Sequence, residues 1–88
     1  MKEKENEKIL KSLASKRRIA IVIFLKNHKE ATVGVIAEKI NLSFKSTSKH
    51  LGILFSADIV EKEQKNTQCF YRFSVQLPEL ARKIISIL

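Results

Sequence analysis

The sequence predicts a small α+β domain that is mainly helical, and three observations support this. Most of the chain carries apolar residues at helical spacing, strict alternation of apolar and polar residues occurs only in the last third, and 44% of the 88 residues are hydrophobic. This hydrophobic content is enough for a folded core, while the length allows one modest core and no second one. We therefore expect a single domain over residues 1–88.

The first third of the chain predicts two helices. Residues 2–14 alternate Lys and Glu before a narrow apolar stripe of Ile9, Leu10 and Leu13. Residues 19–25, IAIVIFL, could by composition form a buried strand. We favour a helix, because the preceding segment is helical and a helix that is apolar on all sides suits the centre of a small bundle.

Two short helices separated by a tight turn follow in the middle of the chain. Thr32 can cap the first, whose apolar residues recur at i, i+3, i+4 and i+7. Asn41 can end it, since Asn often replaces Gly in the left-handed residue after a helix. Ser43 can cap the second helix, which ends near Asp58. Two short helices joined in this way form a helix-turn-helix.

The second helix of this pair is amphipathic, and its front is cationic. Leu51, Leu54 and Phe55 form its apolar back. The opposite face carries small polar and basic side chains, namely Lys45, Ser46, Ser48 and Lys49. No acidic residue lies between Lys39 and Asp58. A helix with such a front can enter the major groove of DNA, which is wide enough to admit a helix.

The last third predicts a two-stranded hairpin and a final helix. A strand starts at residues 59–60, turn residues follow at 64–67, and residues 69–74 alternate with a period of two. We expect Cys69, Tyr71 and Phe73 to face the core, with Cys69 a small apolar residue rather than a redox switch. Pro78 should open the last helix at its first position. The apolar stripe of this helix comprises Leu80, Ala81, Ile84, Ile85 and Leu88.

The charge and the rare residue types narrow the function. A net charge of +8 favours a polyanionic partner, nucleic acid first and an acidic membrane surface second. A single cysteine excludes an internal disulfide. No apolar run is long enough to span a bilayer, and no signal peptide is apparent. We therefore expect a cytoplasmic protein. With two glycines there is no phosphate-binding loop, and no catalytic set is suggested, so we expect neither an enzyme nor a cofactor.

The order of these elements resembles a winged helix-turn-helix regulator of the ArsR type, with the hairpin as the wing. The resemblance covers roughly residues 13–74. It rests on LASKRRIAIVIFL, VIAEKINLS, STSKHLGIL, ADIV and CFYRF, taken in that order and spacing. It implies a homodimeric transcriptional repressor.

Departures from the family pattern concern metal binding. Metal-sensing members carry a Cys-x-Cys type site where this chain has Thr32 and Gly34, or Asp/His pairs on the last helix. The last helix here offers only Glu79 beside Arg82 and Lys83. We therefore expect no metal site.

The sequence thus predicts a transcriptional regulator, most simply a repressor, that binds specific double-stranded DNA as a homodimer. The residues expected at the DNA are Thr32, Ser43, Phe44, Lys45, Ser46, Ser48, Lys49, His50, Lys62, Lys65, Asn66 and Arg72. Those expected at the dimer interface are Ile9, Leu10, Leu13, Leu80, Ile84, Ile85 and Leu88. Phe44 stands where many relatives have Gln, and either packs under the turn or touches a thymine methyl group. Thr47 stands where members of the ArsR-type family usually have an apolar residue.

Two other functions stay open at this point. One is a winged helix that binds a protein and whose basic helix is a solvated face. The zero net charge of residues 58–72 and the presence of Phe44 favour that alternative. The other is a non-specific architectural DNA-binding protein, which would bind all duplexes with equal, salt-sensitive affinity.

Overall fold

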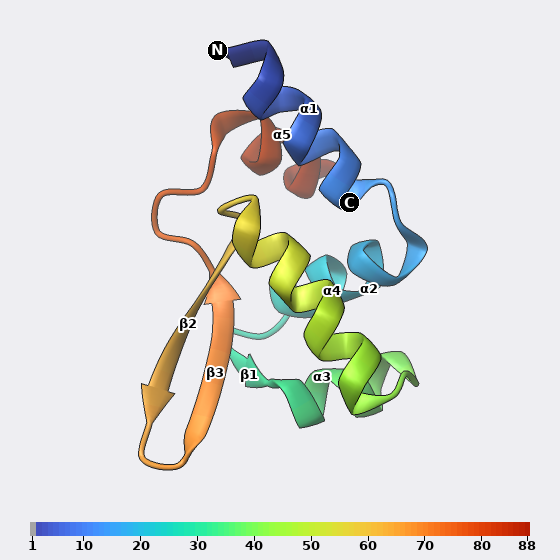
Figure 1. Ribbon diagram of the computed structural model, residues 1–88, viewed down its shortest axis with the longest axis vertical. Helices are drawn as coiled ribbons and strands as arrows, with labels where there is room; N and C mark the ends of the chain where they lie inside the picture. The colour runs from blue at the N-terminus through green and yellow to red at the C-terminus, as the bar shows by residue number, and fades with distance from the viewer. Residues whose placement is uncertain (1) are drawn as a thin grey trace.

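The computed structural model describes residues 2–88 as helices around a small antiparallel sheet, so the predicted α+β, mainly helical class is confirmed (Figure 1). The elements are α1 (Lys2–Leu13), α2 (Lys16–Lys26), β1 (Ala31–Thr32), α3 (Val33–Ile40), α4 (Phe44–Ser56), β2 (Val60–Lys65), β3 (Gln68–Phe73) and α5 (Glu79–Ile87). The segment IAIVIFL lies within α2, so the helical interpretation of that run is correct.

The helices begin and end where the local chemistry predicts. Ser15, Thr32 and Ser43 each accept a hydrogen bond from the backbone N–H three residues later, at 3.3, 3.3 and 3.1 Å. Asn41 ends α3 in the left-handed conformation with φ 57°, and Asp58 follows α4 with φ 62°. The two caps at Thr32 and Ser43 fix both starts of the helix-turn-helix.

The sheet differs from the prediction, because it has three strands rather than two. Their order is β1-β3-β2, and Ala31 and Thr32 of β1 pair with Tyr71 and Phe70 of β3. A strand of two residues carries no periodic signal, so the sequence could not reveal it. A smaller difference concerns Pro78, which is the N-cap of α5 rather than its first residue.

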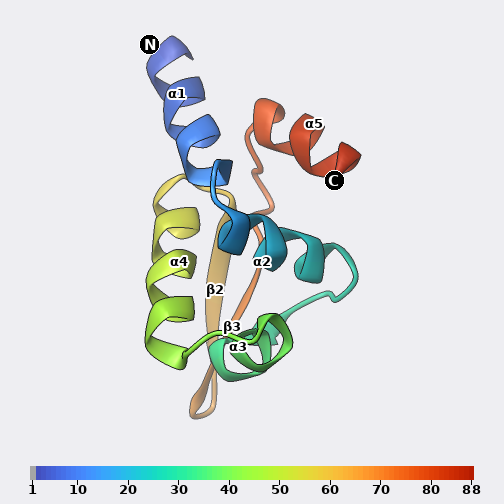
Figure 2. The same cartoon turned by 90° about the vertical axis from the view of Figure 1, so that its right-hand side faces the viewer.

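The core lies where α2, α3, α4 and the inner face of the β2–β3 hairpin meet. Its fully buried large side chains are Ile21, Val22, Ile36, Leu51, Leu54, Ile59 and Val60. Tyr71 is buried with them, and Cys69 and Phe73 pack partly buried against this cluster, as predicted. The helices α1 and α5 contact each other at the opposite end of the domain from the hairpin turn (Figure 2). None of the described helices is long and apolar enough to cross a membrane.

One buried polar group in α4 has no partner. Thr47 is 0% exposed, on the same side of the helix as Leu51 and Leu54, and its hydroxyl makes no hydrogen bond. A buried hydroxyl without a partner retains its desolvation cost without compensation.

We expect Thr47→Val to raise the free energy of unfolding by about 1 kcal/mol, because it removes the unpaired hydroxyl and keeps the shape of the side chain. Urea denaturation measures this. The matched variant Thr47→Ser keeps the hydroxyl and loses the buried methyl group, so it should be less stable than the wild type. A Thr47→Val protein less stable than the wild type would show that the hydroxyl is satisfied after all.

Candidate nucleic-acid interface

Packing of α4 against the core determines which of its residues face solvent. Because Thr47, Leu51 and Leu54 are buried, the opposite face of the helix is open, and it carries Lys45 and Lys49 one turn apart. Both lysines are exposed, and neither has a carboxylate partner among residues 2–88. The structure therefore presents two free cations on an acid-free face of α4, the helix that lies at the front of the molecule in Figure 1.

Small hydroxyl side chains flank this face. Ser46 and Ser48 are half-buried on either side of it, and Ser43 lies at its N-terminal end. The hydroxyls of Thr32 and Ser43 accept hydrogen bonds from their own helices, which leaves the proton of each free to donate to another acceptor. Each could donate to a phosphate oxygen at a helix N-terminus.

Phe44 is open to solvent at the start of α4. Its side chain is 63% exposed, so it does not pack under the turn. It lines a groove of about 400 Å³ between the first turns of α3 and α4 and the start of β3, together with Val33, Gly34, Thr67 and Gln68. The aromatic ring thus lies beside the hairpin, where apolar contact with a partner is possible.

His50 points to the flank of α4 and is tied to α2. The Arg18 Nη1 group donates to His50 Nδ1 at 2.9 Å, while Arg18 Nε donates to the carbonyl of Ser12 at 2.6 Å. A guanidinium can only donate, so Nδ1 must accept and the neutral ring carries its proton on Nε2. Burial, and then the positive charge of Arg18, lower the pKa of His50. The pair fastens α4 to the junction of α1 and α2.

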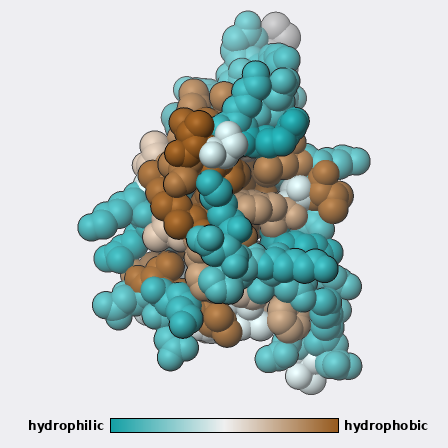
Figure 3. Space-filling model, turned by 180° about the vertical axis from the view of Figure 1, so that it is seen from behind, coloured by the Kyte–Doolittle hydropathy of each residue, from teal (hydrophilic) through white to brown (hydrophobic). Residues whose placement is uncertain are grey.

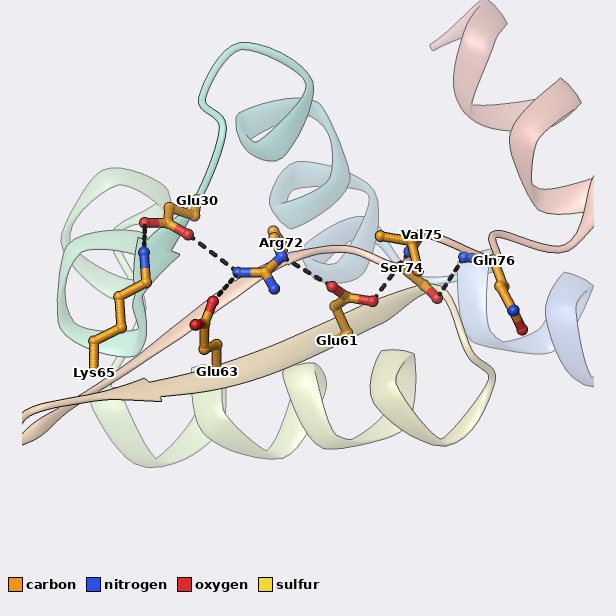
Figure 4. A network of polar contacts seen from close by, with 8 residues as sticks. All are labelled: Glu30, Glu61, Glu63, Lys65, Arg72, Ser74, Val75 and Gln76. Carbon is orange, nitrogen blue, oxygen red and sulfur yellow. Dashed lines mark hydrogen bonds and ion pairs between the residues drawn. The ribbon is translucent and has the colours of Figure 1, made fainter.

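The outer face of the sheet carries an ion-pair network that the sequence did not reveal (Figure 4). Glu61 of β2 pairs with Arg72 of β3, and Ala31 of β1 pairs with Tyr71, so the register places Glu30, just before β1, on the other side of Arg72. Arg72 Nε lies 2.9 Å from Glu61, and its Nη1 lies 2.7 Å from Glu63 and 3.3 Å from Glu30.

Two acids of this network, Glu30 and Glu61, are held ionised. The backbone N–H of Val75, which donates to Glu61 at 3.0 Å, and then Arg72 lower the pKa of Glu61. Lys65, which lies 2.7 Å from Glu30, and then Arg72 lower the pKa of Glu30. Arg72 therefore neutralises carboxylates of its own sheet and is not free for a phosphate, unlike the open lysines of α4.

The other hairpin residues expected at DNA are more accessible. Lys62 projects on the side of α4, with Nζ 4.9 Å from the centre of the Phe55 ring. Lys65 shares its charge between Glu30 and the face of Phe70, whose ring centre is 5.1 Å from Nζ. Asn66 is exposed at the hairpin turn with φ 57°. Lys62 is thus a hairpin cation that contacts α4, through Phe55, and has no acidic partner among residues 2–88.

The predicted dimer residues divide between the core and the surface. Ile9, Leu13 and Ile85 are buried within one chain, because α1 and α5 pack on each other. Leu80 and Ile84 are half-buried, whereas Leu10 and Leu88 are exposed. The sequence analysis missed Ile87, which is 82% exposed on α5. Figure 3 shows a broad hydrophobic area on the rear of the molecule, where Figures 1 and 2 place α5.

Metal binding has no candidate centre in the described part of the chain. Across residues 2–88, no three His, Cys, Asp or Glu side chains are grouped so that they could hold a metal ion. Thr32 and Gly34 line the groove beside Phe44, and Glu79 pairs at 3.7 Å with Lys83.

We expect stability to fall between about pH 7.5 and about pH 5.5 because of His50. Its pKa in the folded protein lies below the value of 6.5 for an unperturbed histidine. The stability that neutral His50 contributes is therefore complete above the unfolded pKa and is lost as the pH falls toward the folded pKa. Urea denaturation at both pH values measures it. In His50→Asn, whose amide oxygen can still accept from Arg18, this fall should disappear.

We also expect Arg72→Met to lower the urea midpoint more than Lys83→Met does. The first change leaves three neighbouring carboxylates with Lys65 alone, whereas the second removes one exposed pair on α5 that contributes little. Equal shifts in the two variants would mean that the network on the sheet adds nothing beyond an ordinary surface pair.

Comparisons with known proteins show that the structure of this chain is similar to those of transcriptional regulators. No family model and no curated protein matches the chain. Solved structures do, over nearly its whole length. HlyU from Vibrio cholerae is 25% identical with a TM-score of 0.84, covering 99% of this chain and 87% of that one. The repressor BigR from Xylella fastidiosa is 28% identical with a TM-score of 0.81, covering 99% and 82%.

A third structure adds a description of its assembly. It is a homodimeric winged helix-turn-helix DNA-binding domain from Mycobacterium bovis, described as a possible ArsR-family transcriptional regulator, with 25% identity and a TM-score of 0.83 over 96% of this chain and 74% of that one. The resemblance seen in the sequence is therefore confirmed, and the chain has the winged helix-turn-helix fold of ArsR- and HlyU-type transcriptional regulators.

Proposed function

We propose that this chain is a homodimeric transcriptional repressor that binds specific double-stranded DNA without a metal. The observation that supports this most is the solvent face of α4, where Lys45 and Lys49 are exposed on a helix face without an acid. The likeness to winged helix-turn-helix regulators, among them a repressor and a homodimeric DNA-binding domain, supports the same function.

In the proposed complex, α4 is the recognition helix and lies in the major groove. Lys49 is long enough to reach guanine O6 and N7, the commonest specific contact in that groove. Lys45 and the hydroxyls of Thr32 and Ser43 contact phosphates, which fixes the register of the helix on the duplex. Ser46 and Ser48 contact base edges, and Phe44 lies against a thymine methyl group.

The hairpin serves as a wing that contacts the flanking DNA. Lys62, Lys65 and Asn66 contribute to this contact, with Lys62 as its main cation because Glu30 neutralises part of the charge of Lys65. Arg72 has a different role, which is to hold the wing against the segment before β1 through Glu30. His50 likewise has a positioning role, because its hydrogen bond with Arg18 fixes α4 relative to α2.

The proposed dimer forms through α1 and α5. Leu10, Ile87 and Leu88 are apolar side chains that the single chain leaves in water, and contiguous exposed apolar surface marks interfaces. A two-fold contact places the same patch of both subunits together and presents two recognition helices to one duplex. Its binding site in DNA should then be a palindrome.

We expect Lys49→Ala and Lys62→Ala to weaken DNA binding in different ways. Loss of a base contact costs about 1–3 kcal/mol on the preferred duplex and relaxes the preference at that position. Loss of a phosphate contact weakens preferred and random duplexes alike and lowers the salt slope by about one. Titration of both variants on both duplexes over a salt series separates the two effects. Lys83→Ala, on α5, is the control and should bind as the wild type does.

The same titration distinguishes the alternatives. Equal weakening of both duplexes by Lys49→Ala would contradict the role of α4 as the reading element and would favour a non-specific architectural protein. Absence of any duplex binding by the wild type would favour a protein-binding winged helix.

We expect Ile87→Glu and Leu10→Glu to give folded monomers, because both side chains are exposed in the single chain and a buried, unpaired carboxylate opposes the contact between subunits. Sedimentation at micromolar concentration measures the mass. Val35→Glu replaces another exposed apolar residue, which lies on α3 outside the proposed interface, and should remain dimeric. A monomeric wild type, or a dimeric Ile87→Glu protein, would contradict this interface.

A further inference from the structure

A cleft of about 400 Å³ lies between α1 and α4, beside the proposed DNA-binding face, with which it shares Lys49. The C-terminal half of α1 and that of α4 form its two walls, and the start of α2 closes one end. This volume falls in the range of small-molecule sites, which are typically apolar hollows with a few convergent polar groups.

The rim of the cleft is cationic. Lys8, Lys11, Arg18 and Lys49 line it, and no Asp or Glu does. The Nζ of Lys11 lies 3.7 Å from a carboxylate oxygen of Glu7, and both side chains are exposed. This ion pair therefore neutralises little of the charge of Lys11. Arg18 is held in place by the carbonyl of Ser12 and by His50, so at least one of the four cations is already oriented before any anion binds.

The floor of the cleft is apolar. Gly52, Ile53 and Ala57 of α4 line it, and Ile53 is 37% exposed although its side chain is large and hydrophobic. An inorganic anion would satisfy the rim and leave this floor in contact with water. We propose that the cleft binds a small amphipathic anion, a carboxylate or sulfonate attached to an apolar body, with the acid at the lysines and the body on the floor.

Access to the cleft is compatible with the proposed dimer. Lys8, Lys11 and Ser12 share one face of α1, because they are spaced i, i+3 and i+4. Leu10 lies on the opposite face of that helix, so a dimer contact through Leu10 leaves the cleft open.

The cleft is also connected to DNA binding through Lys49. This residue lines the cleft and belongs to the face of α4 proposed to read bases. A bound anion neutralises it, so the ligand should weaken DNA binding. This consequence rests on the proposed function, whereas the site itself does not.

The two glycines of the chain provide a matched test. A Cβ added at Gly52 or at Gly34 would meet nothing within 4 Å, and both lie in helices, so a side chain begins in open space at either position. Gly52 lines the cleft, and Gly34 lines the separate groove beside Phe44. Each glycine also gives a distinct amide signal in a ¹⁵N NMR spectrum.

The experiment is a ¹⁵N NMR titration of the full chain with naphthalene-1-sulfonate, and with inorganic sulfate as the anion without an apolar body. We expect the sulfonate to shift the Gly52 signal in a saturable way and to leave Gly34 unchanged. Sulfate should bind at least about tenfold more weakly, because it buries no apolar surface. Gly52→Leu should abolish the effect on neighbouring signals, Gly34→Leu should not, and Lys8→Gln should weaken binding about 1.5- to 5-fold.

Several results would overturn the proposal. Equal shifts at both glycines, equal affinity for sulfate, or unchanged binding in Gly52→Leu would each show that no such site exists. A second measurement compares the DNA affinity of the wild type in the sulfonate and in sulfate at equal ionic strength. Weaker DNA binding in the sulfonate supports the coupling through Lys49, and equal DNA binding at saturating sulfonate overturns the coupling.

Discussion

The structure depends on the packing of one amphipathic helix. The back of α4 buries Leu51 and Leu54 completely against α2, α3 and the hairpin, and it takes even the unpaired hydroxyl of Thr47 out of water. Since the side chains of a helix have fixed directions, burying this back forces Lys45 and Lys49 to face solvent. The rest of the fold supplies the surface on which α4 rests, and the hairpin extends beyond one flank of it.

The distribution of charge refines what the net charge of +8 suggests. Arg18 is held by the carbonyl of Ser12 and by His50, which leaves its charge in place, whereas Arg72 is paired with three glutamates on the outer face of the sheet. The cations that remain free of carboxylates on α4 are Lys45 and Lys49, and they continue toward the rim of the cleft formed with α1. The hydrogen bonds of Arg18 and the ion pairs of Arg72 thus lie apart from the solvent face of α4, which remains a separate positive surface.

Local signals explain why most of the fold could be predicted from the sequence. Capping residues at 15, 32 and 43, left-handed residues at 41 and 58, and period-two alternation in β3 each act within a few residues. The features that escaped prediction all join distant parts of the chain. Examples are the pairing of β1 with β3, the contact of Arg18 with His50, and the burial of Ile9 against α5. Such contacts depend on proximity in three dimensions, which leaves no periodic pattern in a single sequence. The ion pairs of Arg72 escaped prediction for the same reason, since its acidic neighbours come from β2 and from the segment before β1.

The central claim is that α4 reads DNA and that two copies do so together. Selection of tightly bound duplexes from a random pool by the wild-type protein tests it most directly. We expect enrichment of one palindrome whose half-sites lie about 10 base pairs, or a multiple of that helical turn, apart. Enrichment of no sequence, or recovery of a single half-site without symmetry, would contradict it.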